Sequence, residues 1–432
     1  MTLGSFEVSR RTLIRGAGMA AAAVGTGALL AACAPTGSTG GSSDPKVLNL
    51  MIPSWVDAKF IKDVMQGSAA GLIGAKINLI TTDDGTYPAQ AAAAQKAGKA
   101  PDLLMWTAQG IPAFQSAGVK LSPLDKYAVD EDKTAFYEQD YLANSIDDKL
   151  YALGFRSDCR AVGYHGDFAP TAAPDKWTFD EFGEWAQTLK HSGRDAFGFE
   201  AKPGDGRASS NFLPLIWSTG SPFVKKGSSG KWEIGFEAEQ MTQVMKFYYD
   251  SVNTWGITPK EVANWGYQET DTKFAQGTLA AYSTGPFVVA NSKAYPDTLA
   301  NLKLVGLPYA TKPANFWEEL SFMVHEDSTK KDLAWQFITA MRSEKVQAEI
   351  VARTADAWLG VRKAANASVT DPVLKAFVPL LDVSVVPEPI NVGPIMNEAV
   401  LPAIGAVSLK GTSPEQAAEQ LMTAMKDSLT RL

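Results

Sequence analysis

A regular alternation of apolar strands with helices constrains the fold of this chain most. It starts after residue 45 and consists of three apolar runs of strand-like composition, separated by two stretches whose apolar side chains recur at helix spacing. The expected strands are residues 46–52, 76–82 and 103–105, and the expected helices are residues 54–65 and 87–97. Strand, helix, strand, helix, strand is typical of a largely parallel sheet. We therefore predict an α/β fold.

Three later helices are indicated by how they begin. Thr178 and Glu181 have the spacing of a capping box, in which each side chain pairs with the backbone of the other. Residues 327–341 are amphipathic, and residues 413–416 have the composition of a helix start. We assign the apolar stripes of these helices to the core.

Length and composition exclude several classes of protein. The chain has 432 residues, which predicts about two domains, because a domain usually holds about 100–200 residues. Hydrophobic residues make up 45% of the chain and aromatic residues 10%, which excludes a disordered chain and a collagen-like repeat. The formal net charge is −7 and no basic stripe is visible, so we expect no nucleic-acid partner.

The first 33 residues carry two export motifs in sequence order. Residues 9–15 resemble a twin-arginine (Tat) export signal, and residues 30–33, Leu-Ala-Ala-Cys, resemble the lipobox of bacterial lipoproteins. The alternative is an ordinary signal peptide with a chance cysteine. On the lipoprotein interpretation, residues 1–33 are the signal peptide with Cys33 as the lipidated residue, and residues 34–45 form a flexible tether. We therefore expect the protein on the extracytoplasmic face of the cell membrane, held there by its lipid anchor only.

The residue types of common catalytic and metal sites do not occur in their motifs. The chain has no Walker loop, no His-Glu-x-x-His and no Gly-x-Ser-x-Gly sequence, and its three histidines are scattered. With Cys33 lipidated, Cys159 has no partner for a disulfide, and we expect it to be a small buried side chain. We expect no metal and no cofactor. Carboxylate-only chemistry, as in glycosidases, stays open, because any two acids can meet in the fold.

Five segments resemble one protein family and occur in the order typical of it. They are Ala-Pro-Asp-Leu-Leu-Met-Trp at 100–106, the stretch ending in Leu-Ser-Pro-Leu at 114–124, Leu-Tyr-Ala-Leu with Arg-Ser-Asp at 150–158, Phe-x-x-Gly-x-x-Ala with Gly-Pro-Phe at 274–287, and the helix at 325–339. These segments resemble the extracellular solute-binding proteins of ABC importers, in the carbohydrate-binding group that includes maltose-binding protein.

The resemblance implies a two-lobed periplasmic-binding-protein fold, in which hinged lobes hold a ligand in a central cleft. The chain of such a protein passes repeatedly between the lobes. We therefore expect lobe one at residues 46–155 plus 305–350, and lobe two at residues 156–304 plus 351–432. The loop at 387–394 is then expected to face the cleft.

The implied function is the capture of a sugar or oligosaccharide by lobe closure and its delivery to ABC transporter permease subunits. The resemblance implies a monomer that is not an enzyme. Two alternatives stay open: a lipid-anchored glycoside hydrolase, and a ligand-sensing subunit of a membrane receptor.

A sugar ring has an apolar C–H face and a rim of hydroxyl groups, so its site needs aromatic rings beside carboxylate, amide and guanidinium groups. The candidates are tryptophans outside amphipathic stripes, their polar neighbours, and residues at the strand ends and crossings that the resemblance indicates. The predicted ligand-binding residues are Trp55, Asp83, Asp84, Trp106, Gln109, Arg156, Asp158, Trp265, Phe287, Trp317, Glu318 and Trp358.

Of these residues, Trp106 and Trp358 match cleft positions of the family, and we expect both to stack on sugar rings from opposite lobes. The alternative for any one tryptophan is burial within its own lobe. For Arg156 and Asp158 the alternative is an ion pair at the hinge.

Overall fold

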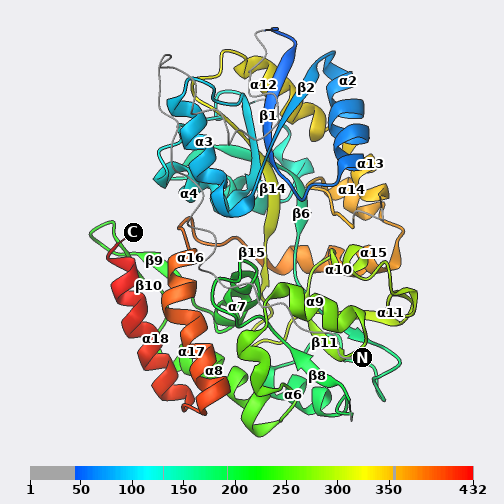
Figure 1. Ribbon diagram of the computed structural model, residues 1–432, viewed down its shortest axis with the longest axis vertical. Coiled ribbons are helices and arrows are strands. Elements are labelled where there is room, and N and C mark those ends of the chain that lie inside the picture. The colour runs from blue at the N-terminus through cyan, green and yellow to red at the C-terminus, as the bar shows by residue number, and fades with distance from the viewer. Residues whose placement is uncertain (1–43, 130, 192, 354–356, 432) are drawn as a thin grey trace, which may run out of the picture. The chain divides into compact units, whose positions relative to one another are not determined.

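The computed structural model describes residues 44–129, 131–191, 193–353 and 357–431 (Figure 1). The predicted signal peptide, the lipidated Cys33 and the tether up to residue 43 lie outside these ranges. The described chain is built on two main β-sheets that share no strand. Within these residues, no helix has the length and apolar character needed to span a bilayer.

The first sheet has five strands. In spatial order they are β2 (Lys76–Thr82), β1 (Val47–Pro53), β3 (Leu103–Thr107), β14 (Glu318–Val324) and β6 (Ala152–Asp158). β1 pairs in parallel with β2 and with β3, whereas β14 lies antiparallel between β3 and β6. The predicted alternation at the start of the chain is thereby confirmed.

Both faces of this sheet are covered by helices, because β1 is apolar on both sides. Leu50 belongs to a core that includes Phe60 and Phe337, whereas its neighbour Met51 belongs to a second core that includes Phe114. Burial on both faces is the usual state of parallel strands. The helical segments of this lobe are α1 (Ala58–Phe60), η1 (Ile61–Ala69), α2 (Ala70–Ile73), α3 (Tyr87–Lys96), η3 (Ala108–Gly110), α4 (Ile111–Ser116), α5 (Glu138–Ala143), α12 (Lys331–Met341) and α13 (Glu344–Ala352).

Figure 1 shows α3 and α4 on one side of the strands and α2 and α13 on the other. The predicted helix at 327–341 is confirmed, but it begins at Lys331, because the residues before it form a turn in which Lys330 N–H donates to Ser328 Oγ at 3.1 Å.

The second sheet carries the other lobe. Its strands, in spatial order, are β12 (Leu302–Val305), β7 (Ala161–His165), β11 (Leu279–Thr284) and β8 (Asp195–Gly198). The helices of this lobe include α6 (Phe179–Gln187), α7 (Ala208–Trp217), α8 (Ala238–Tyr249), α9 (Tyr267–Ala275), α10 (Val288–Asn291), α11 (Pro296–Asn301), α16 (Gly393–Ile395), α17 (Leu401–Gly405) and α18 (Pro414–Leu429).

Two predicted helix starts in this lobe are confirmed. Thr178 Oγ1 accepts from the backbone N–H of Glu181, and the Glu181 carboxylate accepts from the backbone N–H of Thr178, so the capping box at the start of α6 is complete. Ser413 caps α18 by accepting from the N–H of Gln416. These hydrogen bonds lie within the first turn of each helix, so they determine where the helix begins and do not depend on its tertiary packing.

Within the described residues, three segments cross between the two sheets. β6 continues into β7 through Cys159 and Arg160 alone. The other two crossings pair as a small parallel sheet of β13 (Asn315–Phe316) and β15 (Ser384–Val385). Cys159 is buried and free, as predicted, in a third core that also includes residues of α14 (Lys363–Ala367) and α15 (Pro372–Phe377).

Asn315 binds two of the crossings together. Its Oδ1 accepts from the backbone N–H of Arg160 at 2.8 Å, and its Nδ2 donates to the Arg160 carbonyl at 2.6 Å. A buried side chain thus replaces a strand partner where the chain leaves the first sheet. The fold is the predicted α/β class with two lobes, and the residue boundaries that we gave for the lobes stay a prediction.

Candidate functional site

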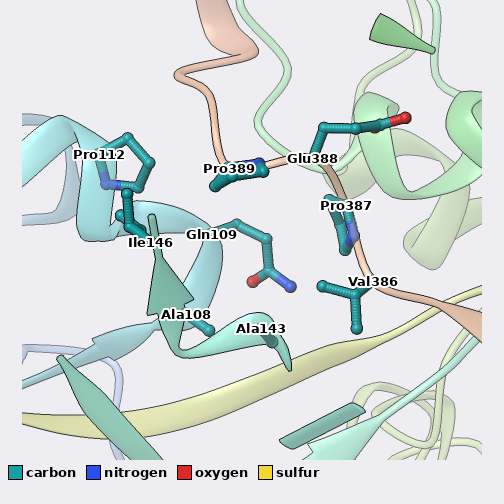
Figure 2. Close-up of a pocket in the computed structure, with 9 residues that line it drawn as sticks. All are labelled: Ala108, Gln109, Pro112, Ala143, Ile146, Val386, Pro387, Glu388 and Pro389. Atoms are coloured by element: carbon teal, nitrogen blue, oxygen red, sulfur yellow. The ribbon is translucent and has the colours of Figure 1, made fainter. Parts of the chain in front are cut away.

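A narrow pocket lies beside the crossings (Figure 2). One wall comes from the first lobe and the other from the loop after β15. The lining residues are Ala108, Gln109, Pro112, Ala143, Ile146, Val386, Pro387, Glu388 and Pro389. The loop expected to face the cleft therefore does line a pocket. Its free space is about 10 Å³, roughly what one water molecule needs.

Gln109 is the central polar side chain of the pocket. It lies on η3, directly after β3, and its Nε2 donates to the carbonyl of Trp317 at 2.7 Å. Figure 2 shows the Gln109 amide extending toward Val386 and Pro387. One amide thus reaches from the first lobe to a crossing segment, and its position fits the predicted role of Gln109 as a cleft residue.

The Glu388 carboxylate points away from Gln109 in Figure 2. Its Oε1 accepts from the backbone N–H of Phe223 at 2.8 Å, so it anchors the loop to the second lobe. Burial raises the pKa of Glu388, and this hydrogen bond opposes the shift. Glu388 therefore fixes the position of the pocket wall.

A chain of alternating charges runs along the first crossing. Asp158 Oδ2 pairs with Arg156 Nη2 at 3.3 Å, and Asp158 Oδ1 pairs with Arg160 Nη1 at 3.1 Å. Arg160 Nη2 also binds the Glu318 carboxylate. Arg160, a residue that the sequence analysis missed, thus joins the two predicted acids, and the predicted Arg156 is attached through Asp158.

The two acids of this chain titrate in opposite directions. Burial raises the pKa of Asp158 to about 6, although Arg160 and Arg156 oppose that shift. Burial also acts to raise the pKa of Glu318, but Arg160, Arg156 and Arg207 together outweigh it, and the pKa lies below its usual range. Glu318 therefore stays ionised at neutral pH.

The Phe287 ring lies against the same charges from the second lobe. The guanidinium carbons of Arg160 and Arg207 lie 5.4 and 4.9 Å from its centroid, which is cation–π distance. A Cβ at Gly285 would lie 2.5 Å from this ring and 2.9 Å from Asp158 Oδ1. Glycine is therefore required for the ring and the carboxylate to approach this closely.

Trp106 is half-buried at the end of β3. Its ring packs edge-on against Tyr87, with the centroids 5.1 Å apart. A Cβ at Gly110 would lie 2.1 Å from Trp106 Cδ1, so this glycine leaves room for the ring. Trp106 precedes the pocket residue Gln109 by three positions but does not itself line the pocket, and ligand contact by its ring stays a prediction.

Trp358 lies in the core of the first lobe and is only 9% exposed. Its ring packs on Phe60 at 4.3 Å and on Phe155 at 6.2 Å between centroids, and Arg156 lies 4.7 Å from its centroid. The expectation that Trp106 and Trp358 face a ligand from opposite lobes is therefore wrong. The Trp358 ring packs on Phe60 inside the first lobe, although the chain segment that carries it leads into a crossing.

Two predicted tryptophans are buried elsewhere. Trp317 is fully buried in the core around the crossings, where its Nε1 donates to Glu319. Trp265 lies in the core of the second lobe, with Lys273 Nζ 4.5 Å from its ring centroid. Both tryptophans are therefore buried in the protein core, as in the alternative that we gave for any one tryptophan.

Three predicted residues are not members of the charge chain. Trp55 is 48% exposed on the first lobe. Asp83 is exposed, and its Oδ1 accepts from the N–H of Gly85 at 3.1 Å within a turn. Asp84 begins the 3₁₀ turn Asp84–Thr86, and its side chain lies outside the part of the structure that is described.

The structure thus places Asp158, Glu318 and Phe287 around Arg160. Arg156 pairs with Asp158, and Trp358 contacts Arg156. The signal for Arg160 was present, because Arg156, Asp158 and Arg160 alternate with the period of a strand. No local pattern indicated that Glu388 would face Phe223. Among the described residues, no group of His, Cys, Asp and Glu has the arrangement of a metal site.

Comparison with known proteins identifies this architecture. The sequence profile of the bacterial extracellular solute-binding proteins matches residues 67–376. Curated protein sequences give no match. The solved structure of the sugar-binding protein MalE from Xanthomonas citri is similar with a TM-score of 0.76 and 17% identity, over 89% of this chain and 98% of that one.

Two further solved structures are similar in the same way. The cyclic α-maltosyl-1,6-maltose binding protein from Arthrobacter globiformis has a TM-score of 0.75 and 17% identity, over 89% of this chain and 99% of that one. The GacH receptor of Streptomyces glaucescens, solved unliganded and with acarbose, has a TM-score of 0.72 and 21% identity, over 88% of this chain and 98% of that one. At these identities the likeness establishes the two-lobed fold.

Proposed function

Because the chain belongs to the bacterial extracellular solute-binding proteins, we propose that it captures a sugar or oligosaccharide between its lobes and delivers it to an ABC transporter permease. Family membership places the protein outside the cytoplasm. The sugar class is supported by the structural relatives, among them a sugar-binding protein and a receptor solved with acarbose.

The observation that carries the proposal is the pocket between the first lobe and the loop at 386–389. It presents the Gln109 amide among apolar side chains, a mixture that is usual for a small-molecule site, although no aromatic ring of the described residues lines it. Its free space of about 10 Å³ is too small for a sugar ring. A ligand can enter only if the two walls separate, so binding requires lobe opening followed by closure.

A contact at the edge of the pocket suits such a closure. Ile146, which lines the pocket, begins the tip of the hairpin of β4 (Ser145–Ile146) and β5 (Lys149–Leu150). The next residue, Asp147, has a left-handed backbone with φ of 49° and forms an ion pair with Lys226 at 2.5 Å. Lys226 belongs to the hairpin of β9 (Val224–Lys226) and β10 (Trp232–Ile234) in the second lobe. Asp147 and Lys226 thus join the two lobes.

The test is binding of a panel of mono- and oligosaccharides, maltotriose and acarbose included, by calorimetry, with small-angle scattering to follow lobe closure. At a sugar concentration of 100 times Kd, the protein should gain about 2.7 kcal/mol of stability. Failure of the whole panel to bind, or tight binding with an unchanged scattering profile, contradicts capture by closure.

Gln109 has a matched control in the same protein. Gln109→Ala removes the pocket amide, and we expect sugar affinity to fall about two- to tenfold, the usual effect of one hydrogen bond. Gln139 Nε2 likewise donates from the first lobe to a crossing, at 3.2 Å from the Ser384 carbonyl, but Gln139 does not line the pocket. Gln139→Ala should leave affinity unchanged. Equal losses in both variants contradict ligand contact by Gln109.

One observation bears on the hydrolase alternative. Asp158 and Glu318 have pKa values shifted in opposite directions, as the two acids of a glycosidase do. Both oxygens of Asp158 and one oxygen of Glu318 nevertheless pair with Arg156 or Arg160. We therefore propose binding without hydrolysis. The appearance of new reducing ends when oligosaccharides are incubated with the protein contradicts this.

The lipid anchor remains part of the proposal and rests on the sequence of residues 1–33. We expect Cys33→Ser to abolish the incorporation of labelled palmitate and to release the protein from the membrane or leave it unprocessed. Lysine substitution of Arg10 and Arg11 should block Tat export. Labelling that persists in Cys33→Ser contradicts the anchor, and native mass spectrometry of the folded protein tests our expectation of a monomer.

A further inference from the structure

A cluster of buried acids lies beside the crossings, where neither the charge chain nor the pocket includes it. Glu319 is the second residue of β14 and Asp140 lies on α5, and both are fully buried. Arg342, directly after α12, is 1% exposed, and Glu131 completes the cluster. We call Glu319, Asp140, Glu131 and Arg342 the hinge cluster.

The two fully buried acids face the same point of β6. A Cβ at Gly154 would lie 2.7 Å from Asp140 Oδ1 and 2.7 Å from Glu319 Oε2. The two carboxylate oxygens therefore lie within twice that distance of each other. A glycine at this position allows the acids to approach, because any side chain would occupy the space between them.

The hinge cluster contains one cation and three carboxylates. Arg342 Nη2 pairs with Asp140 Oδ2 at 2.8 Å, and Arg342 Nε pairs with Glu131 Oε1 at 2.9 Å. No ion pair reaches Glu319 among the described residues. If all three acids were ionised, the buried cluster would carry two uncompensated negative charges, which a low-dielectric interior strongly disfavours.

The surroundings of Glu319 favour protonation of its carboxylate. Burial raises the pKa of Glu319 well above its usual range and the nearby Asp140 raises it further, while Trp317, Arg342 and Ser321 oppose the shift. Burial also raises the pKa of Asp140, against the attraction of Arg342. Three further titratable groups lie around the cluster. Tyr141 donates its hydroxyl to Glu131 at 2.6 Å, Lys133 Nζ lies 5.2 Å from the Tyr141 ring centroid, and Arg362 donates to the Arg342 carbonyl at 3.4 Å.

Asn144 at the end of α5 leaves an acceptor for a proton near the pair. Its Nδ2 donates to Glu319 and, at 2.7 Å, to the carbonyl of Asp140. Its Oδ1 is buried and accepts no hydrogen bond from the described residues. Asn144 thus binds both acids through its Nδ2 and leaves one buried acceptor in the cluster unused.

The hinge cluster is connected to the pocket through Trp317. The indole Nε1 donates to Glu319 Oε2 at 3.0 Å, the backbone N–H donates to Val385 at 3.0 Å, and the backbone carbonyl accepts from Gln109. Trp317 therefore connects Glu319 to the β13–β15 crossings and to Gln109 in the pocket wall, and a displacement of Glu319 is expected to move Trp317.

We propose that Glu319 and Asp140 share one proton at neutral pH, and that this proton locks the crossings, so that its loss loosens them and favours lobe opening. Two facing carboxylates without the proton would repel each other and admit water between β14 and α5. The lock is a property of the crossings themselves. Its effect on a bound sugar, faster release at higher pH, rests on the proposed function.

The experiment compares wild type with Glu319→Gln, which has the shape of the protonated acid, and with the control Glu239→Gln on an exposed position of α8. The infrared carbonyl band of a protonated carboxyl group should be present at pH 7 in wild type and in the control, and absent in Glu319→Gln. Absence of this band in wild type overturns the shared proton.

The pH dependence of unfolding gives a second readout without any ligand. A group whose pKa is higher in the folded than in the unfolded state stabilises the fold below its unfolded pKa, and this contribution is lost as pH rises. Relative to Glu319→Gln, the unfolding constant of wild type should therefore increase about tenfold per pH unit above about pH 4.3. Parallel profiles overturn the proposal. If Glu319→Gln does not fold, Asp140→Asn takes its place, because it also leaves a single carboxyl group.

Lobe opening is judged by small-angle scattering between pH 6 and 9, with expansion expected in wild type and not in Glu319→Gln. If the infrared band shows the proton but wild type does not expand as pH rises, the proposed lock is wrong. With maltotriose as the probe, faster dissociation at higher pH is expected only in wild type and in the control. If maltotriose does not bind, the proposed sugar function loses support, while the infrared, unfolding and scattering results still decide on the lock.

Discussion

Replacing Asn315 with alanine removes the side chain that joins two of the crossings. Its Oδ1 accepts from the backbone N–H groups of Arg160 at 2.8 Å and Phe316 at 2.7 Å, and its Nδ2 donates to the Arg160 carbonyl at 2.6 Å. Asn315, Arg160 and Phe316 are at most 4% exposed, so water cannot replace these bonds without local opening. Asn315→Ala therefore leaves three buried backbone groups without a partner.

The magnitude follows from the cost of an unsatisfied buried polar group, about 1–3 kcal/mol each. Asn315→Ala should lower the free energy of unfolding by about 3 kcal/mol or more, a large part of the 5–15 kcal/mol that is usual for a folded protein. The loss should be greater than that for most single substitutions, which cost about 1 kcal/mol.

Urea denaturation followed by tryptophan fluorescence measures this loss. The matched control is Asn253→Ala, because Asn253 Nδ2 also donates to two backbone carbonyls, those of Tyr249 and Val407, each at 3.1 Å, but its side chain is exposed. There water can replace the amide, and we expect a loss below about 1 kcal/mol. Equal losses in the two variants refute the argument that burial makes Asn315 costly to remove.

Three further predictions address the aromatic site, the closure contact and pH. Trp358→Ala should lower the free energy of unfolding by about 3–5 kcal/mol, because a core ring is lost. If Trp106 stacks on a sugar, Trp106→Ala should instead weaken sugar binding by at least about 2 kcal/mol. Titration of both variants with a sugar that binds wild type distinguishes the loss of affinity from the loss of stability. Asp147→Asn should speed sugar release severalfold at most, because its pair with Lys226 is exposed, and stopped-flow traces in high salt should erase the difference. Since burial raises the pKa of Asp158 to about 6, wild type should lose stability relative to Asp158→Asn between about pH 4 and pH 6 and not above, and denaturation at several pH values would show a flat difference if this is mistaken.

The sequence alone predicted the α/β class and much of the first sheet. β2 has the bounds that the apolar run indicated, and the helix η1 buries Ile61, Val64 and Met65 as their spacing requires. The capping box at Thr178 formed as predicted. Periodicity and capping could be predicted because they depend on residues within one or two turns or strand positions of each other.

The candidate site was only partly predictable. The position of Trp106 at a strand end followed from the alternation of strands and helices. The position of Trp358 did not, because its ring packs on Phe60, and the same loop tryptophan would have suited a ligand or a core. Burial of a loop side chain is determined by partners far away in the chain, which no local pattern names.

The crossings were decided by the tertiary structure alone. Asn315 and Arg160 are 155 positions apart, and Asn144 and Glu319 are 175 apart, yet each pair is hydrogen-bonded in the interior. The sequence determined that strands, helices and polar side chains are present, because these depend on local spacing. Only the folded chain determined which polar groups are buried together, because a buried donor or acceptor must find its partner among the residues that the two lobes bring to the same place.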